Sequence, residues 1–266
     1  MSPVLVVAGL DPSGGAGIAA DAEAVTAFDG TPWLVASALT AQGPAGARGW
    51  WPVAPDVVLA QLEALLGPRS RPRAMKTGMI GSAAAAVALA QRLAERPLGR
   101  VPLVVDPVLA ASSGLALVSG APPRAAFEPL LARATLATPN WIELAILAGR
   151  EVATEDDAIR AARELPSRAV LVKGGHRDGA PVDLLVRGRA VARFTGKRVA
   201  GTARGTGCRL ASAIAAQLAR GVELEAAVAA AKRYVEAYIR GVVAATSVER
   251  GPHLRGASGR RRGGRT

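Results

Sequence analysis

Short apolar runs alternate with longer segments of helical periodicity along most of the chain. Each apolar run ends in glycine or a polar residue, which is typical of strands buried in a parallel sheet. We therefore expect strands at residues 4–8, 33–39, 74–77, 101–105, 135–138 and 169–172. Two further runs, 182–186 and 190–194, predict a hairpin that turns at residues 187–189.

Helices are expected between these strands, and some begin at recognisable start signals. Pro55 suits the first turn of a helix, and Ser82 suits the cap of an alanine-rich helix. The predicted helices span residues 18–28, 55–66, 83–95, 123–131, 140–147, 155–165 and 224–243, and one more runs from the turn 205–208 to about residue 221.

This alternation predicts an α/β fold with a mainly parallel sheet and helices on both faces. We expect one domain over residues 1–250, because half of the 266 residues are hydrophobic and no linker interrupts the pattern. Residues 251–266 are expected to form a disordered basic tail. The last twelve residues contain five arginines and no acid, and they cannot build a core.

Composition narrows the choice of partners. The net charge of +12 suggests nucleic acid, but aromatic residues make up only 3% of the chain, so the stacking platform of a single-strand binder is missing. We expect nucleic acid to contact at most the tail. No apolar run is long enough to span a membrane, and the first residues lack the basic start of a signal peptide. The single cysteine excludes an intramolecular disulfide and fits a cytoplasmic protein.

Polar residues follow the predicted strands at the point where each strand ends. They are Asp11, Gln42, Lys76, Asp106, Asn140 and Lys173. In open α/β sheets the ligand crevice lies at the carboxyl ends of the strands. Each residue also has a structural explanation, such as a turn before proline for Asp11 and Asp106, or a solvated surface position for the lysines. One shared site explains all six together.

Two glycine-rich turns are candidate anion cradles. Residues 13–17 and 205–208 each precede a helix, where free backbone N–H groups and the helix dipole favour an anion. Cys208 lies in the first helical turn, so we expect a lowered thiol pKa there; the alternative is a small buried cysteine. The chain contains no Walker A pattern, which excludes a P-loop enzyme.

A carboxylate and an Asn/Glu pair are candidate ligands for hydrated Mg²⁺. Asp106 would be joined by Asn140 and Glu143, since Mg²⁺ binds through one or two carboxylates together with phosphate oxygens. The spacing of Asn140 and Glu143 also fits a capping box, which needs no metal.

An ordered set of motifs resembles one family over nearly the whole chain, to about residue 252. Its motifs are Asp-Pro-Ser-Gly-Gly-Ala-Gly-Ile from Asp11, Thr-Ala-Gln from Thr40, Lys-Thr-Gly-Met from Lys76, Val-Asp-Pro from Val105, Thr-Pro-Asn-Trp-Ile-Glu from Thr138, Lys-Gly-Gly-His from Lys173 and Gly-Thr-Gly-Cys from Gly205. The set resembles the hydroxymethylpyrimidine/phosphomethylpyrimidine kinases of thiamine biosynthesis, in the ribokinase-like superfamily.

The resemblance implies ATP-dependent phosphorylation of 4-amino-5-hydroxymethyl-2-methylpyrimidine and then of its monophosphate. It also implies Mg²⁺, a three-layer α/β/α fold and a homodimer. The implied catalytic residues are Cys208 as base, Gly205 and Gly207 as the anion hole, and Thr206 between them. The implied substrate-binding residues are Gly9, Asp11, Asp21, Gln42, Met79 and Val108. The implied nucleotide residues are Asp106, Asn140 and Lys173, and the implied metal residues are Asp106, Asn140 and Glu143.

Some positions depart from the family pattern and keep alternatives open. Arg204 and Arg209 flank the cradle where histidine and threonine are usual, and we hypothesise that they help hold a phosphorylated substrate. Gly43 replaces the usual asparagine after Gln42. A pyridoxal kinase of the same superfamily is the main alternative. A non-catalytic ligand- or nucleic-acid-binding protein is a distant alternative. Such a protein would have no need of a catalytic base, the role that Cys208 is expected to have.

Overall fold

The protein is described by a computed structural model that places residues 2–43, 46–68, 70–110, 116–175, 181–199, 201 and 203–249. The predicted tail, residues 251–266, and His176 of the Lys173 motif lie outside the described residues. The helices are α1 (Gly17–Ala27), α2 (Pro55–Leu65), α3 (Ala83–Ala94), α4 (Pro123–Arg133), α5 (Trp141–Ala148), α6 (Glu155–Glu164), α7 (Thr206–Ala219) and α8 (Leu224–Glu249).

The strands form one large sheet and one small one. They are β1 (Ser2–Leu10), β2 (Gly30–Gly43), β3 (Gly46–Pro52), β4 (Ala74–Thr77), β5 (Gly81–Ser82), β6 (Leu103–Val105), β7 (Val118–Ser119), β8 (Leu136–Ala137), β9 (Val170–Val172), β10 (Val182–Arg187) and β11 (Ala190–Thr195). The large sheet has the order β11-β10-β9-β8-β6-β4-β1-β2-β3, and β5 pairs with β7 in the small one.

The six central strands of the large sheet, from β9 across to β2, are parallel. The edges are antiparallel: β10 and β11 form the predicted hairpin beside β9, and β3 pairs with β2. Because the central strands run in one direction, their carboxyl ends meet at one rim of the sheet. The sheet therefore brings distant polar residues to a single edge.

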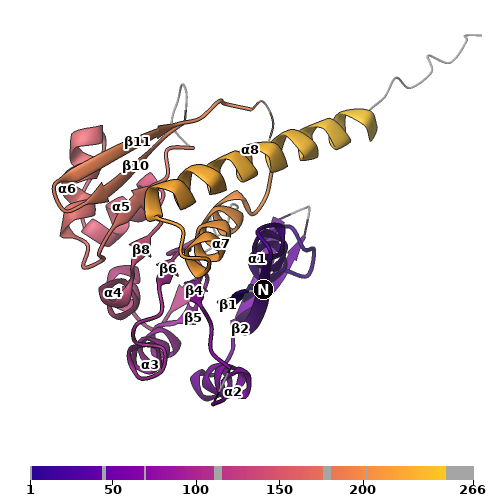
Figure 1. Ribbon diagram of the computed structural model, residues 1–266, viewed down its shortest axis with the longest axis vertical. Coiled ribbons are helices and arrows are strands. Elements are labelled where there is room, and N and C mark those ends of the chain that lie inside the picture. The colour runs from indigo at the N-terminus through magenta and orange to yellow at the C-terminus, as the bar shows by residue number, and fades with distance from the viewer. Residues whose placement is uncertain are drawn as a thin grey trace, which may run out of the picture.

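Helices cover both faces of the sheet and make three layers (Figure 1). One core lies between the sheet and α2 to α6, with Phe127, Leu89 and Leu144 among its buried residues. The other lies between the sheet and α1, α7 and α8, with Leu210 and Ile214 of α7 against Val6 and Val104. The predicted three-layer α/β/α fold is confirmed.

Local start signals work as the sequence predicts. Pro55 opens α2, and the Ser82 hydroxyl accepts a hydrogen bond from the Ala85 backbone at the start of α3. Among the described residues, every helix is too short or too polar to cross a bilayer.

Three strands were not predicted. β3 has the sequence Gly-Ala-Arg-Gly-Trp-Trp-Pro, which shows no alternation, and it forms because the end of β2 offers it a partner. β5 and β7 contain two residues each and form only by pairing with one another. β2 itself extends through Gly43, beyond the expected end at residue 39.

Candidate active site

The start of α7 has the geometry of a main-chain anion cradle, the role predicted for it from the sequence. Gly205 precedes the helix with φ of 67°, and a Cβ atom there would lie 2.3 Å from the carbonyl oxygen of Gly15. Only glycine fits this contact, in which the two glycine-rich turns pack backbone to backbone. No side chain caps the helix start, and its first turn holds no acid. The first N–H groups of α7 are therefore not taken by a side-chain cap and can meet an anion.

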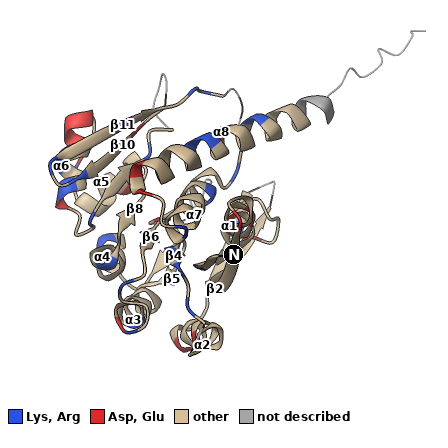
Figure 2. Cartoon of the chain, in the orientation of Figure 1, with Lys and Arg blue, Asp and Glu red and all other residues tan. Residues whose placement is uncertain are grey.

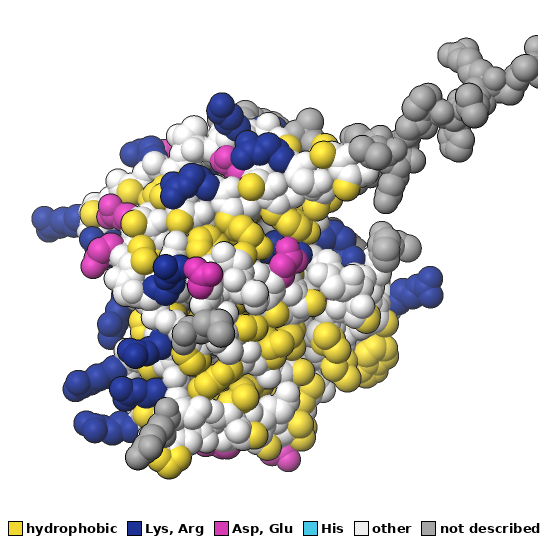
Figure 3. Space-filling view, turned by 45° about the vertical axis from the view of Figure 1, so that its right-hand side comes forward, with side chains coloured by type: hydrophobic (Ala, Val, Ile, Leu, Met, Phe, Trp, Pro, Cys, Tyr) yellow, Lys and Arg dark blue, Asp and Glu magenta, His cyan; other side chains and the backbone are white. Residues whose placement is uncertain are grey.

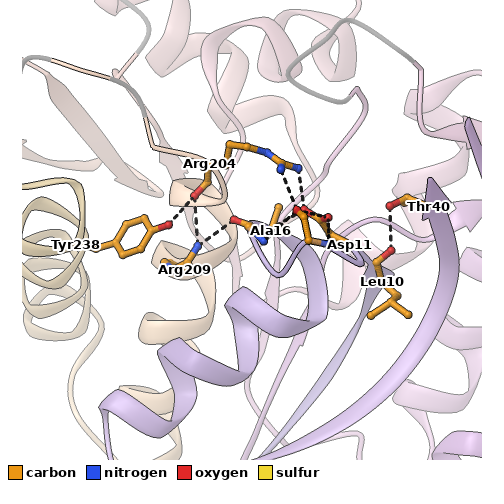
Figure 4. A network of polar contacts seen from close by, with 9 residues as sticks. Leu10, Asp11, Ala16, Thr40, Arg204, Arg209 and Tyr238 are labelled. Carbon is orange, nitrogen blue, oxygen red and sulfur yellow. Dashed lines mark hydrogen bonds and ion pairs between the residues drawn. The ribbon is translucent and has the colours of Figure 1, made fainter. Parts of the chain in front are cut away.

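Arg204 and Arg209 form hydrogen bonds that link the two glycine-rich turns (Figure 4). The Arg204 guanidinium donates to Asp11 at 2.8 Å and to Ser13 at 2.9 Å. Asp11 is buried and also accepts hydrogen bonds from the backbone of Ser13 and Ala16 at 3.0 Å each. Asp11 thus holds the shape of the first turn, which is the structural role that its place before proline allowed.

Arg209 is buried and bonded inside the protein. It donates to Gly15 at 3.1 Å and to Glu23 at 2.6 Å, and its guanidinium lies 3.9 Å from the ring centroid of Tyr238. Its burial and these contacts argue against the hypothesis that Arg209 holds a substrate phosphate. Arg204 joins the two glycine-rich turns, and Arg209 joins the first of them to α1 and α8.

Opposite the cradle lies a cluster of buried charges at the strand ends. Lys173 follows β9, and its Nζ lies 2.7 Å from Asp106 Oδ1 and 3.8 Å from Glu143 Oε2. Asp106 follows β6 and also accepts a 3.0 Å hydrogen bond from Thr138. A Cβ atom on Gly207 would lie 3.2 Å from Lys173 Nζ and 3.9 Å from Asp106 Oδ2. The first turn of α7 therefore faces this cluster directly.

The charges of the cluster adjust one another. Burial disfavours the ionised form of Asp106, but Lys173 and Lys76 outweigh it and lower the pKa of the carboxyl. Burial also disfavours the Lys173 charge, yet Asp106 and Glu143 raise the pKa of its ammonium. Burial raises the pKa of Glu143 to about 7, despite the nearby Lys173. Within this cluster, Glu143 is therefore the carboxyl that changes between its protonated and its ionised form near neutral pH.

The main chain next to Lys173 is fixed by residues of β10 and α8. Asp183 of β10 accepts a 2.7 Å hydrogen bond from the backbone of Gly174 and pairs with Lys232 of α8 at 2.5 Å. The residue after Lys173 is therefore fixed to both β10 and α8.

Asn140 and Glu143 form the capping box that the sequence allowed. Asn140 Oδ1 accepts from the Glu143 backbone at 2.9 Å, and Glu143 Oε2 accepts from the Asn140 backbone at 2.7 Å. Among the described residues, no three His, Cys, Asp or Glu side chains converge on one point as a metal cage. Asp106 and Glu143 supply two carboxylates beside the cradle, which fits an ion such as Mg²⁺ that keeps phosphate and water ligands.

Cys208 has a pKa opposite to the one expected. The residue is half-buried, and burial raises the pKa of its thiol to about 11, although Lys76 acts to lower it. The expectation of a lowered thiol pKa at this helix start is therefore wrong for the free protein. A hydrogen bond from the Gly17 backbone and the charge of Lys76 favour the thiolate, but they do not overcome the loss of solvent.

Asp21 belongs to a fully buried network beneath the cradle. Both of its carboxylate oxygens lie 2.8 Å from Lys76 Nζ, and Oδ1 also accepts a 2.8 Å hydrogen bond from Ser212. These three residues come from α1, β4 and α7. Asp21 thus lies inside the protein rather than on an open surface.

The remaining predicted residues lie around a small apolar cluster. Met79 and Val108 pack with Ala38, Leu117 and Trp50. A Cβ atom on Gly9 would lie 2.8 Å from the Met79 sulfur, so Met79 covers Gly9 closely. Gln42 lies half-buried in β2, opposite Ala47 of β3.

Sequence reasoning missed three contributors. Thr138 and Ser212 each donate to a buried carboxylate, and Trp50 lies on a strand that was not predicted and donates to the Ala116 carbonyl at 2.8 Å. The sequence signal for β3 was the adjacent pair Trp50 and Trp51, because aromatic residues favour strands and this chain has few of them. A hollow of about 560 Å³ between α6 and the β10–β11 turn contains none of the predicted site residues.

A glycine turn at a helix start that faces a fixed ammonium and two carboxylates, at the rim of a three-layer α/β sheet, is an arrangement suited to phosphoryl transfer. The sequence model of one family, described as phosphomethylpyrimidine kinase, matches residues 11–253. The chain belongs to the phosphomethylpyrimidine kinase family.

Two relatives illustrate the match. The hydroxymethylpyrimidine/phosphomethylpyrimidine kinase of Streptomyces coelicolor is 40% identical over 236 residues, covering 87% of this chain and 86% of that protein. The thiamine biosynthesis bifunctional protein of Geobacter sulfurreducens is 42% identical over 242 residues, covering 89% of this chain. The match spans only 49% of the length of that bifunctional protein.

Solved structures share the fold. The crystal structure of phosphomethylpyrimidine kinase from Clostridium difficile has a TM-score of 0.78 at 33% identity, covering 90% of this chain and 100% of that one. The pyridoxal kinase of Staphylococcus aureus, in complex with AMP-PCP and pyridoxal, has a TM-score of 0.76 at 29% identity, covering 90% and 88%. The fold is therefore shared with kinases for two different rings.

Proposed function

We propose that this protein transfers the γ-phosphoryl group of ATP to the hydroxymethyl group of 4-amino-5-hydroxymethyl-2-methylpyrimidine, and then phosphorylates the monophosphate to the diphosphate, in thiamine biosynthesis. Membership of the family and relatives named for both kinase steps support the proposal. Its strongest structural support is the close approach of Gly207, one residue before Cys208, to Lys173 and Asp106, where an added Cβ atom would lie 3.2 Å from Lys173 Nζ.

The nucleotide side would be formed by the main chain and the charged cluster. The backbone of Gly205, Thr206 and Gly207 surrounds the transferring phosphoryl group, and Lys173 meets its negative charge. Asp106 fixes the Lys173 ammonium through the 2.7 Å ion pair. Asn140 contributes by capping α5 and so fixing Glu143 at the rim.

Asp106 and Glu143 are the residues that would hold Mg²⁺. The ion would neutralise charge on the phosphates during transfer. The pKa of Glu143, which burial raises to about 7, is consistent with a carboxylate that lacks a full counter-charge in the free protein.

The acceptor side would lie between Cys208 and the apolar cluster of Met79 and Val108. The acceptor oxygen bonds to the γ-phosphorus while the bond to the bridging oxygen breaks, so ADP leaves with that electron pair. The hydroxyl proton passes to the Cys208 thiolate. Gly9 and Gln42 would border this space, while Asp11 and Asp21 contribute from within the protein by holding the first turn and Lys76.

Pyridoxal is the second candidate acceptor. The likeness to pyridoxal kinases, including one solved with pyridoxal, supports it, as does the departure at Gly43 beside Gln42. The two acceptors share the phosphoryl-transfer side, so only the ring contacts would differ.

A product assay separates these candidates. Purified protein is mixed with Mg²⁺ and ATP and, in separate reactions, the pyrimidine, its monophosphate and pyridoxal, and the products are identified by mass. Formation of pyrimidine mono- and diphosphate supports the proposal. Pyridoxal phosphate alone moves the protein to the alternative acceptor, and no product from any reaction refutes both.

We also propose that the protein is a homodimer. Leu39 of β2 and Trp51 of the edge strand β3 are cross-strand neighbours, with 47% and 60% of their surface exposed. Figure 3, which turns this side of the molecule forward, shows hydrophobic side chains gathered on the surface. An unpaired edge strand beside exposed apolar side chains favours association with a second copy.

The cytoplasmic location expected from the sequence stays a prediction.

Nucleic acid is not part of the proposal. Within the described residues, lysine and arginine lie on several elements, including α4 and α8 (Figure 2).

A further inference from the structure

Lys76 is a buried cation that the proposed mechanism leaves without a role. It lies in the middle of the sheet, on β4, and has no exposed surface. An ammonium in such a place is costly unless it is paired, and here Asp21 pairs with it through both carboxylate oxygens. An apolar residue at this position would avoid the desolvation cost, so stability alone does not explain the pair.

The ammonium of Lys76 is directed toward the cradle. A Cβ atom on Gly78, two residues further along the chain, would lie only 2.7 Å from Lys76 Nζ. The side chain therefore extends toward the carboxyl end of β4, the rim where the cradle lies. Gly78 leaves the space that this direction needs.

Helix α7 connects this pair to Cys208. Cys208 and Ser212 are four residues apart on α7 and so lie on the same face of the helix. Ser212 donates to the carboxylate that holds Lys76, and α7 packs against β4. The face of α7 that carries Cys208 is therefore the face that lies over the Lys76–Asp21 pair.

We infer that Lys76 is a positioning residue of the phosphoryl-transfer site, whose buried ammonium stabilises negative charge at Cys208 while Asp21 holds it there. The inference deepens the proposed function and rests on the role given there to Cys208. The charged groups that act on this thiol are Lys76 from β4, Asp21 from α1, and Asp106 and Lys173 from the rim cluster. Lys76 has the largest effect that opposes burial at the thiol.

The test measures Cys208 itself. It is the only cysteine in the chain, so the rate of alkylation by iodoacetamide reports on this thiol and needs no turnover. The rate is measured between pH 7.5 and 10 for the wild type, Lys76→Met and Lys76→Arg, with Ser212→Ala as a matched variant that removes a hydrogen bond but no charge. Circular dichroism and thermal melting establish that each variant is folded.

We expect Lys76→Met to lower the alkylation rate at a given pH by about tenfold or more, the effect of one pKa unit. Lys76→Arg keeps the charge and should stay within about threefold of the wild type, as should Ser212→Ala. If Lys76→Met does not fold, because it leaves Asp21 buried and unpaired, the double variant Asp21→Asn/Lys76→Met replaces it and should react several-fold more slowly than the wild type.

Two results would overturn the inference. One is a folded variant without the Lys76 charge whose thiol reacts at the wild-type rate. The other is equal slowing in Lys76→Met and Lys76→Arg, which would mean that packing and not charge is responsible. Because alkylation is measured without substrate, either result stands whether or not the protein phosphorylates the pyrimidine.

Discussion

Gly207 and Lys173 approach so closely that a single methyl group would fill the space between them. A Cβ atom at residue 207 would lie 3.2 Å from Lys173 Nζ. In the Gly207→Ala variant we expect the methyl group to displace the ammonium or the phosphoryl oxygen that it meets. A displacement of about 1 Å can cost on the order of 100-fold in rate, so kcat/KM should fall by roughly that amount.

Stability should change in the opposite direction, which makes this prediction specific. Replacing glycine by alanine inside a helix stabilises it by roughly 0.5–1 kcal/mol. Gly241→Ala in α8 is the matched control, because nothing lies within 4 Å of its added Cβ atom. Urea unfolding should show both variants at least as stable as the wild type, with activity lost only in Gly207→Ala. Full activity in Gly207→Ala would contradict the assignment of the cradle.

Cys208→Ala should separate binding from transfer. Loss of a general base typically costs about 10²–10⁴ in rate, whereas the cradle and Lys173 remain to bind nucleotide. We expect kcat to fall within that range and the dissociation constant of a non-hydrolysable ATP analogue, measured by calorimetry, to change less than about threefold. Wild-type turnover in Cys208→Ala would exclude the proposed base.

Alkaline pH should increase the activity of the wild type. The thiol pKa is raised to about 11, so the thiolate fraction grows as pH rises through the range below that value. We expect kcat to increase with pH until the protein begins to unfold, and Cys208→Ala to lack this increase. Initial rates at saturating substrate between pH 6 and 10 would show it, with circular dichroism at each pH as the control.

Mg²⁺ binding should weaken below neutral pH because of Glu143. Its pKa is raised to about 7, so the carboxylate is ionised above that pH and protonated below it. A proton then competes with the ion, and the affinity should fall up to about tenfold per pH unit below 7. Calorimetric titration of Mg²⁺ with an ATP analogue would measure this. Glu143→Gln is the control. Protonation of the nucleotide phosphates lowers Mg²⁺ affinity equally in both proteins, so the further loss of affinity with falling pH should be seen only in the wild type.

The sequence predicted the order of layers because periodicity depends on local residues. Asp106, Asn140 and Lys173 could be placed at one rim because parallel strands end together, whichever side chains lie between them. The contacts of Asp11 with Arg204 and of Asp21 with Lys76 were not predictable, since they join residues 193 and 55 positions apart. β3 was missed because a strand rich in glycine depends on its partner rather than on its own pattern.

The pKa of Cys208 shows a second limit of sequence reasoning. A position in the first turn of a helix is readable from the sequence and favours the thiolate. Loss of solvent depends on everything that packs around the thiol, including α1 and the two glycine-rich turns, and here it is the larger effect.

Association should depend on the Leu39–Trp51 pair. We expect Leu39→Glu combined with Trp51→Glu to convert a dimer to a monomer, because charge at an exposed apolar contact opposes its desolvation. Light scattering after gel filtration would report the mass. Ile142→Glu on α5 is the control, since that side chain is 67% exposed and lies on a helix rather than at the β2–β3 edge. A monomeric wild type would rule out the homodimer directly.

The scarcity and burial of lysine determine how the protein responds to amine chemistry. The chain has four lysines, and Lys76, Lys173 and Lys232 are each ion-paired with a buried aspartate. Lys197 is exposed. Acylating reagents such as succinimidyl esters should therefore attach a dye or a solid support at Lys197 and the N-terminal amine while leaving the two site lysines unmodified. The protein can then be immobilised through these amines without an added tag.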